Sequence, residues 1–118
     1  MSEEGGTISA DGVTIEKSLD RDQFKTPAIT FDIRSSRDEQ VTVRITDHIP
    51  EGIPIEDVGF HPEYGGDRWS IEDHDITFDR RLDPGEEYET IYGVRDVDED
   101  DIEALLDQSP SLEVGDPE

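Results

Sequence analysis

The fold class is decided by the stretch AITFDIRSSRDEQVTVRIT, residues 28–46. Apolar residues alternate with polar ones in both halves of this stretch: Ile29, Phe31 and Ile33, then Val41, Val43 and Ile45. Successive side chains of a β-strand point to opposite faces, so each half predicts a strand with one apolar face. The charged residues between the halves predict a tight connection, as in an antiparallel pair.

Shorter alternating runs predict further strands at residues 7–10, 13–17, 55–60, 68–72, 76–79 and 87–94. Turn signals such as Asp11-Gly12 and Pro84-Gly85 separate these runs at intervals of about eight to twelve residues. This rhythm of seven or eight short strands is typical of an all-β, antiparallel β-sandwich. We expect Trp69 and Tyr92 to meet the two apolar strand faces in its interior.

The two ends of the chain depart from this pattern of alternating strands. Residues 1–6 are expected to form a flexible tail, residues 7–95 the sandwich, and residues 96–118 an acidic tail. Within that tail, residues 98–107 predict a short helix, because acidic side chains in its first turn suit the helix dipole. One apolar stripe runs along this helix at helical spacing: Ile102, Leu105 and Leu106.

The charge balance is extreme, with 33 acidic residues against 10 basic ones and a formal net charge of -23. Low hydrophobicity with high net charge is the signature of disorder, so an acidic, partly disordered regulator is one interpretation. The alternating apolar runs favour a folded domain instead. Acidic excess, scarce lysine and the absence of cysteine resemble the composition of proteins from salt-accumulating archaea, where salt screens the repulsion.

Several classes of site and partner are disfavoured by composition. A chain without cysteine has no disulfide and no thiolate metal site. Nucleic acid is disfavoured because phosphate binding needs a basic patch, and the arginines are scattered among carboxylates. No apolar run approaches the length of a membrane span, and the first residues carry no secretory signal pattern. We therefore expect a cytoplasmic protein without membrane insertion.

Three features occur in a fixed order between residues 13 and 95. They are Thr46-Asp47-His48-Ile49-Pro50-Glu51-Gly52 at a strand end, Trp69 on a middle strand, and Leu82-Asp83-Pro84-Gly85-Glu86 before the last strand. This set resembles the immunoglobulin-like conserved-repeat domain of prokaryotic cell-envelope and surface proteins. The resemblance implies a β-sandwich that binds or spaces other proteins, and it supplies no catalytic residues.

Candidate partner-binding residues fall in two places. Phe60 and Tyr64 are the two aromatic residues of the predicted loop run Phe60-His61-Pro62-Glu63-Tyr64, and loop aromatics are common contact residues. The second candidate is the stripe of Ile102, Leu105 and Leu106, since a helix this short must pack on something. It either docks on its own sandwich or lies in the groove of a partner, and its spacing does not separate these alternatives.

The remaining clusters of candidate ligands do not match the residue spacing of known metal or catalytic motifs. His48, His61 and His74 are spaced far from any standard ligand motif, and a metal site would require their loops to converge. Residues 96–107 imitate the start of a calcium loop, but Asp101 and Asp107 stand where glycine and glutamate are required. No nucleophile elbow or phosphate-binding glycine loop is present. We therefore expect no catalytic residue, no cofactor and no specific metal.

These observations favour a non-catalytic module for protein–protein interaction or assembly, whose partner is another protein or a second copy of the chain. Unpaired backbone groups on edge strands would give such a module a route to association. The alternatives are a small metal-binding or hydrolytic enzyme built on the sandwich, and the acidic regulator that folds on a partner.

The charge pattern makes the fold dependent on salt. We expect the β-sheet circular dichroism signal and the free energy of unfolding to rise from dilute buffer to molar KCl. The reason is that the Debye length falls from about 10 Å at 0.1 M to about 3 Å at 1 M salt. Urea titrations at a series of KCl concentrations measure this rise. A chain that gains no sheet signal at any salt concentration would contradict the fold prediction.

Overall fold

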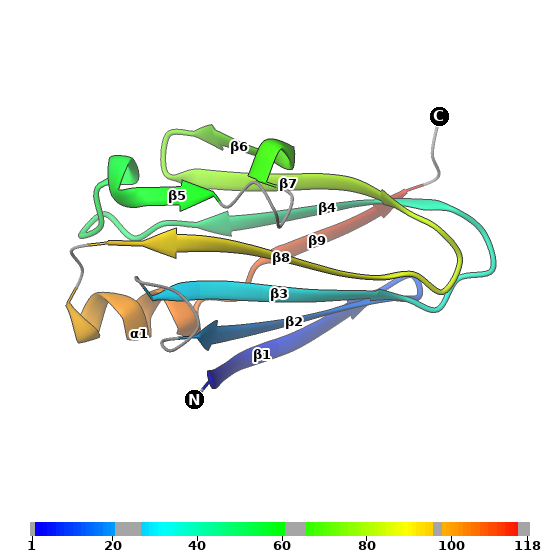
Figure 1. Ribbon diagram of the computed structural model, residues 1–118, viewed down its shortest axis with the longest axis horizontal. Helices are drawn as coiled ribbons and strands as arrows, with labels where there is room; N and C mark the ends of the chain where they lie inside the picture. Colours follow the sequence, from blue (N-terminus) through cyan, green and yellow to red (C-terminus); the bar gives the residue numbers. More distant parts are fainter. Residues whose placement is uncertain (1, 21–26, 61–65, 96–97, 116–118) are drawn as a thin grey trace.

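The computed structural model describes residues 2–20, 27–60, 66–95 and 98–115, and these form two packed antiparallel sheets (Figure 1). The first sheet has the order β1 (Ser2–Ala10), β2 (Val13–Asp20), β3 (Ala28–Ser35), β8 (Glu87–Val94), β5 (Val58–Phe60). The second has the order β6 (Trp69–Glu72), β7 (Asp75–Leu82), β4 (Val41–His48), β9 (Ser111–Gly115). The helical elements are η1 (Ile55–Asp57), η3 (Gly66–Arg68) and α1 (Glu99–Asp107). The predicted all-β sandwich is confirmed.

The core lies between the sheets and uses the apolar strand faces that the alternation predicts. Six fully buried side chains come from β3 and β4: Ile29, Phe31, Ile33, Val41, Val43 and Ile45. Trp69 lies among them, with its ring centroid 5.9 Å from that of Phe31 and 5.6 Å from that of Tyr92. Its indole N–H donates a 2.9 Å hydrogen bond to the buried hydroxyl of Thr90. A tryptophan of the second sheet is thus bonded to a strand of the first.

The first hairpin follows from its turn residues. Asp11 and Gly12 both have positive φ angles, 48° and 83°, as a two-residue type I′ turn requires. A Cβ atom added at Gly12 would lie 2.7 Å from Cδ of Arg37, so the arginine side chain would have to shift to admit one. This turn sets the register in which Val13 faces Ala10.

Two predictions about the ends of the chain need correction. The first strand begins at Ser2 rather than at residue 7, because residues 2–6 pair with the end of β2 and are not a free tail. The predicted acidic tail also contains a strand of the sandwich: residues 111–115 form β9, which pairs with β4 and places Leu112 opposite Ile45. Leu112 and Val114 alternate over too short a run to predict a strand from the sequence. The run 55–60 is also divided, with η1 before the short β5.

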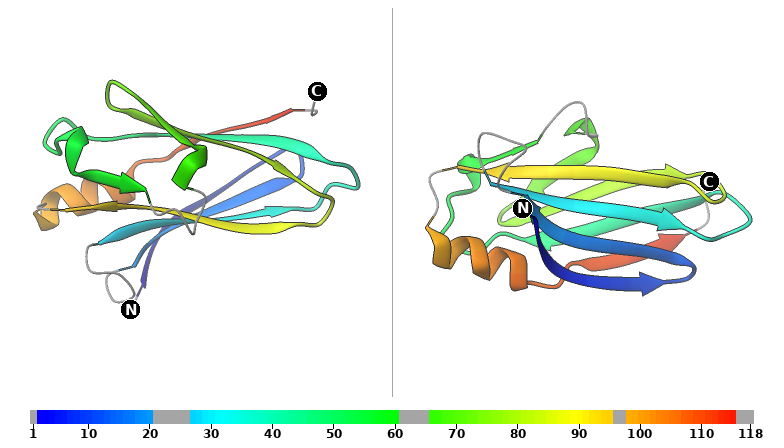
Figure 2. Two further views of the ribbon diagram at one scale, coloured as in Figure 1. Left: turned by 45° about the horizontal axis from the view of Figure 1, so that its top comes forward. Right: turned by 60° about the horizontal axis from the view of Figure 1, so that its bottom comes forward.

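The two lateral sides of the sandwich are built differently (Figure 2). On one side, α1 lies against β1 and β2 and leads into β9, so helix and strand together cover the opening between the sheets. On the other side the sheets end in the short strands β5 and β6. There the ring of Phe60 stacks on Trp69 at 5.4 Å. One side is therefore covered by a dedicated segment and the other by edge strands.

Within the described part of the chain, no helix has the length and apolar character needed to cross a membrane.

Candidate functional site

The predicted contact loop is only partly placed. Phe60 ends β5 and is half-buried, because its ring stacks almost parallel to that of Trp69. Tyr64 lies outside the described residues. Phe60 therefore belongs to the rim of the core and presents only part of its ring to the surface.

The apolar stripe of α1 packs within its own domain. Ile102, Leu105 and Leu106 are all buried and belong to the same cluster as the sandwich core. The structure thus places the helix in the self-docked arrangement, which was one of the two alternatives left by the sequence. In this arrangement the three side chains are not available to a partner, because the sandwich already covers them.

The histidines come together in part. Rings of His48 and His74 lie 6.3 Å apart between centroids, and Nδ1 of His48 is 2.8 Å from Asp75. His74 contacts the backbone carbonyl of Ile49 through its own Nδ1. His61 lies outside the described residues. Among the side chains that are described, no group of three or more His, Cys, Asp or Glu residues has the geometry of a metal site.

The acids of the calcium-like stretch begin α1. Asp98 is the N-cap residue, and its carbonyl accepts the first helical hydrogen bond, from the amide of Ile102. Its side chain makes no capping bond. Glu99, Asp100 and Asp101 fill the first turn, where negative charge is favourable next to the helix dipole.

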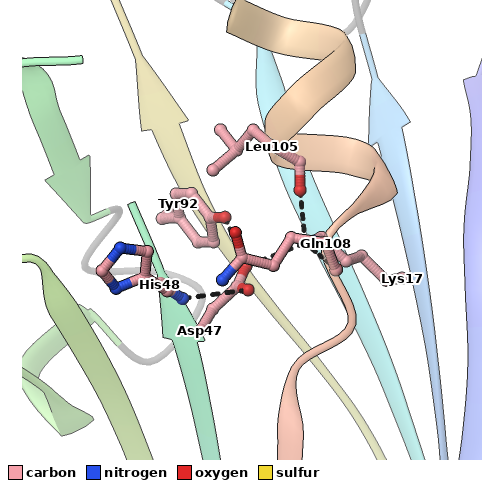
Figure 3. Close-up of polar contacts among 6 residues, drawn as sticks. All are labelled: Lys17, Asp47, His48, Tyr92, Leu105 and Gln108. Carbon is pink, nitrogen blue, oxygen red and sulfur yellow. Dashed lines mark hydrogen bonds and ion pairs between the residues drawn. The ribbon is translucent and has the colours of Figure 1, made fainter. Parts of the chain in front are cut away.

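The most unusual polar group is a lysine in the core, Lys17, whose side chain is 2% exposed (Figure 3). Its Nζ lies 3.0 Å from Oδ2 of Asp47 on the opposite sheet. It also donates hydrogen bonds of 2.6 and 2.8 Å to the carbonyls of Leu105 and Gln108. Leu105 lies in the last turn of α1 and Gln108 is its C-cap residue, and helices leave acceptors unsatisfied at this end. All three donors of the ammonium group are therefore used.

Asp47 is equally enclosed. The hydroxyl of Tyr92 donates a 2.6 Å hydrogen bond to Oδ2, and the backbone amide of His48 donates one of 3.2 Å to Oδ1. Burial lowers the pKa of Lys17 against the opposing effect of Asp47. Burial, and then the charge of Asp47, raise the pKa of Tyr92 well above its ordinary value. The network therefore joins both sheets and the helix through one lysine, one carboxylate and one phenol.

Sequence reasoning did not identify this network, although a signal for it exists. Lys17 is one of two lysines in the chain and continues the inward series Val13, Ile15. Asp47 continues the series Val43, Ile45 in the same way. A cation and an anion at inward positions of facing strands indicate a buried pair. What the sequence does not contain is which carbonyls complete it.

A second polar feature is a row of carboxylates on the outer face of the first sheet. The strand register places Glu16 opposite Asp32, and Asp32 opposite Glu89. Partial desolvation, and then the charge of Glu16, raise the pKa of Asp32. Desolvation and the charge of Asp32 likewise raise the pKa of Glu89. Like charges directly opposite one another destabilise a sheet, so this row opposes folding at neutral pH.

The edge strand β6 carries an exposed apolar side chain. Ile71 is 47% exposed, and among the residues that the structure describes it is the one large hydrophobic side chain in the exposed class. It pairs with the buried Ile76 of β7, and among the described strands β6 is the outermost of the second sheet. The exposed Glu72 follows it on the same strand. Ile71 is therefore an exposed apolar side chain on an outer strand, whereas Trp69 of the same strand is buried in the core.

In comparisons with known proteins, no family model, curated protein or solved structure matches this chain. The resemblance to an immunoglobulin-like repeat domain therefore remains a prediction.

The buried pair yields a stability prediction. Replacing Lys17 with Met would leave Asp47 charged in the core without its cation, and we expect a loss of about 3–5 kcal/mol in unfolding free energy. The double variant Lys17→Met with Asp47→Leu should lose less than the sum of the two single changes, because no lone charge remains. Urea unfolding in molar KCl measures all three variants. Additive losses would show that the two groups do not interact.

The carboxylate row yields a pH prediction. A carboxyl group whose pKa is raised on folding makes the folded state less stable as the pH rises above about 4, which is the ordinary carboxyl pKa in an unfolded chain. We therefore expect Asp32→Asn to raise unfolding free energy at pH 7, by about 0.2–1 kcal/mol as for other cross-strand pairs. The gain should disappear near pH 4. Asp38→Asn in the exposed β3–β4 loop is the charge-matched control, and equal effects of both variants would refute the role of the row.

Proposed function

We propose that this domain is a non-catalytic protein-interaction module of a salt-adapted archaeon, working in the cytoplasm. The observation that carries the proposal is the exposed Ile71 on β6, the outermost strand of the second sheet among the residues that the structure describes. The acidic surface supports the salt-adapted setting, since carboxylates keep molecules apart where salt strengthens apolar association. Against such a surface, an apolar residue on an open edge stands out as a contact point.

The remaining edge strands are better protected against pairing. The pairing of β1 with β2 has a register shift between Glu4 and Gly6, and such bulges discourage further pairing. β9 carries the exposed Glu113, and β5 has three residues, with Gly59 at its centre. Charged side chains and short length both discourage an edge strand from pairing with another chain. β6 is also short and also carries an exposed acidic residue, Glu72, but among the described edge strands it is the one with an exposed large apolar side chain.

The partner that fits is an extended segment of another protein, added to β6 as a further antiparallel or parallel strand. Backbone hydrogen bonds would supply affinity, and the side chains opposite Ile71 and Glu72 would supply specificity. We therefore infer a partner segment with an apolar residue next to a lysine or arginine. Such a segment would cover the exposed isoleucine and pair with its acidic neighbour.

A site-specific crosslink tests this function. A photoreactive amino acid at the exposed Ser70 should capture a protein in salt-accumulating archaeal cells, and Ile71→Glu in the same chain should reduce that product several-fold. The same group placed at Glu39, in the β3–β4 loop, is the control. A product that survives Ile71→Glu, or that equals the yield at Glu39, would refute binding at the β6 edge.

A further inference from the structure

The last described segment, residues 98–115, is a helix and a strand held to the sandwich without any covalent crosslink. Three side chains of α1 are buried in the core, and β9 pairs with residues 42–46 of β4. In the sequence, residues 95–98 connect the end of β8 to the start of α1. The segment is therefore a compact unit that occupies one continuous site on the rest of the domain.

That site has features specific to its occupant. Lys17 donates two hydrogen bonds to carbonyls at the C-terminal end of the helix, those of Leu105 and Gln108, which have no acceptor role within the helix. The edge of β4 supplies backbone groups for a five-residue strand. Between them the core accepts three apolar side chains at helical spacing. Without the segment, β4 would be an open edge and the ammonium of Lys17 would lose two acceptors.

We propose that this site also takes residues 98–115 of a second copy of the chain, so that two copies exchange their C-terminal segments. The contacts that hold the segment to the body of the domain are a β-ladder, apolar packing and hydrogen bonds, and none of them depends on which chain supplies the segment. Such exchange requires no new interface and is a low-cost route to dimers. The proposal concerns the β4 edge and not the β6 edge, so it stands apart from the proposed function.

Charge makes the exchange dependent on salt. The segment carries seven carboxylates and no lysine or arginine: Asp98, Glu99, Asp100, Asp101, Glu103, Asp107 and Glu113. It docks on a body that is itself acidic, with Lys17 inside and Arg44 on the surface, 4.0 Å from Glu113, as nearby cations. In molar salt this repulsion is screened and docking is favoured. The intramolecular segment competes at an effective concentration of about mM, so dimers should increase at high protein concentration.

Arg44 and Glu113 allow a direct test. They face each other across the β4–β9 pair, both exposed, in a chain without cysteine. Cβ atoms of opposed residues in an antiparallel pair lie about 4.5–5.5 Å apart, close to the separation in a disulfide. Full-length Arg44→Cys and Glu113→Cys chains would be mixed, unfolded and refolded together in molar KCl, then oxidised gently. A disulfide between residue 44 of one chain and residue 113 of the other forms only when a segment docks in trans.

We expect a mixed disulfide dimer whose yield rises with protein concentration and exceeds, several-fold, that from Arg44→Cys with Glu39→Cys. The double variant with both cysteines in one chain should form an intramolecular disulfide at low concentration, which proves that the two positions are opposed. A mixed dimer no more abundant than the Glu39→Cys control would overturn the exchange. A double variant that stays reduced would overturn it as well, since β9 would then not lie on β4.

Discussion

The ammonium group of Lys17 lies where three parts of the molecule meet: the first sheet through β2, the second sheet through Asp47, and the C-terminal end of α1. Removing a cation and an anion from water costs free energy that their attraction only partly offsets. We infer that the pair fixes an arrangement rather than adding much stability. An apolar side chain at this position would leave α1 with unsatisfied carbonyls and no defined end point on the sandwich.

Most of the sandwich was predictable because strand periodicity is a local property. The apolar faces of β3 and β4 are set by alternation within each strand, and the structure buries them as expected. β9 was not predictable, because its two apolar residues, Leu112 and Val114, are only half-buried. They form a strand because they pair with β4, which is distant in the sequence. The same holds for Lys17, whose role depends on carbonyls 88 and 91 residues further along the chain.

Charged side chains have different surroundings in the core and on the outer face of the first sheet. In the core, Asp47 has a cation, a phenol and a backbone amide as partners. On the outer face, Glu16, Asp32 and Glu89 stand opposite one another with raised pKa values for Asp32 and Glu89. Buried charges must be paired, whereas exposed ones are screened by salt. A saline environment would therefore remove the penalty of the outer row and leave the inner network unaffected.

Trp69 has a practical consequence for following this molecule in solution. It is the single tryptophan of the chain, and it is buried between the sheets with its indole N–H bonded to Thr90. Its intrinsic fluorescence therefore reports on the polarity of the space between the two sheets without any attached dye. A red shift of the emission would mark the moment at which water reaches the layer between them, separately from the loss of backbone structure.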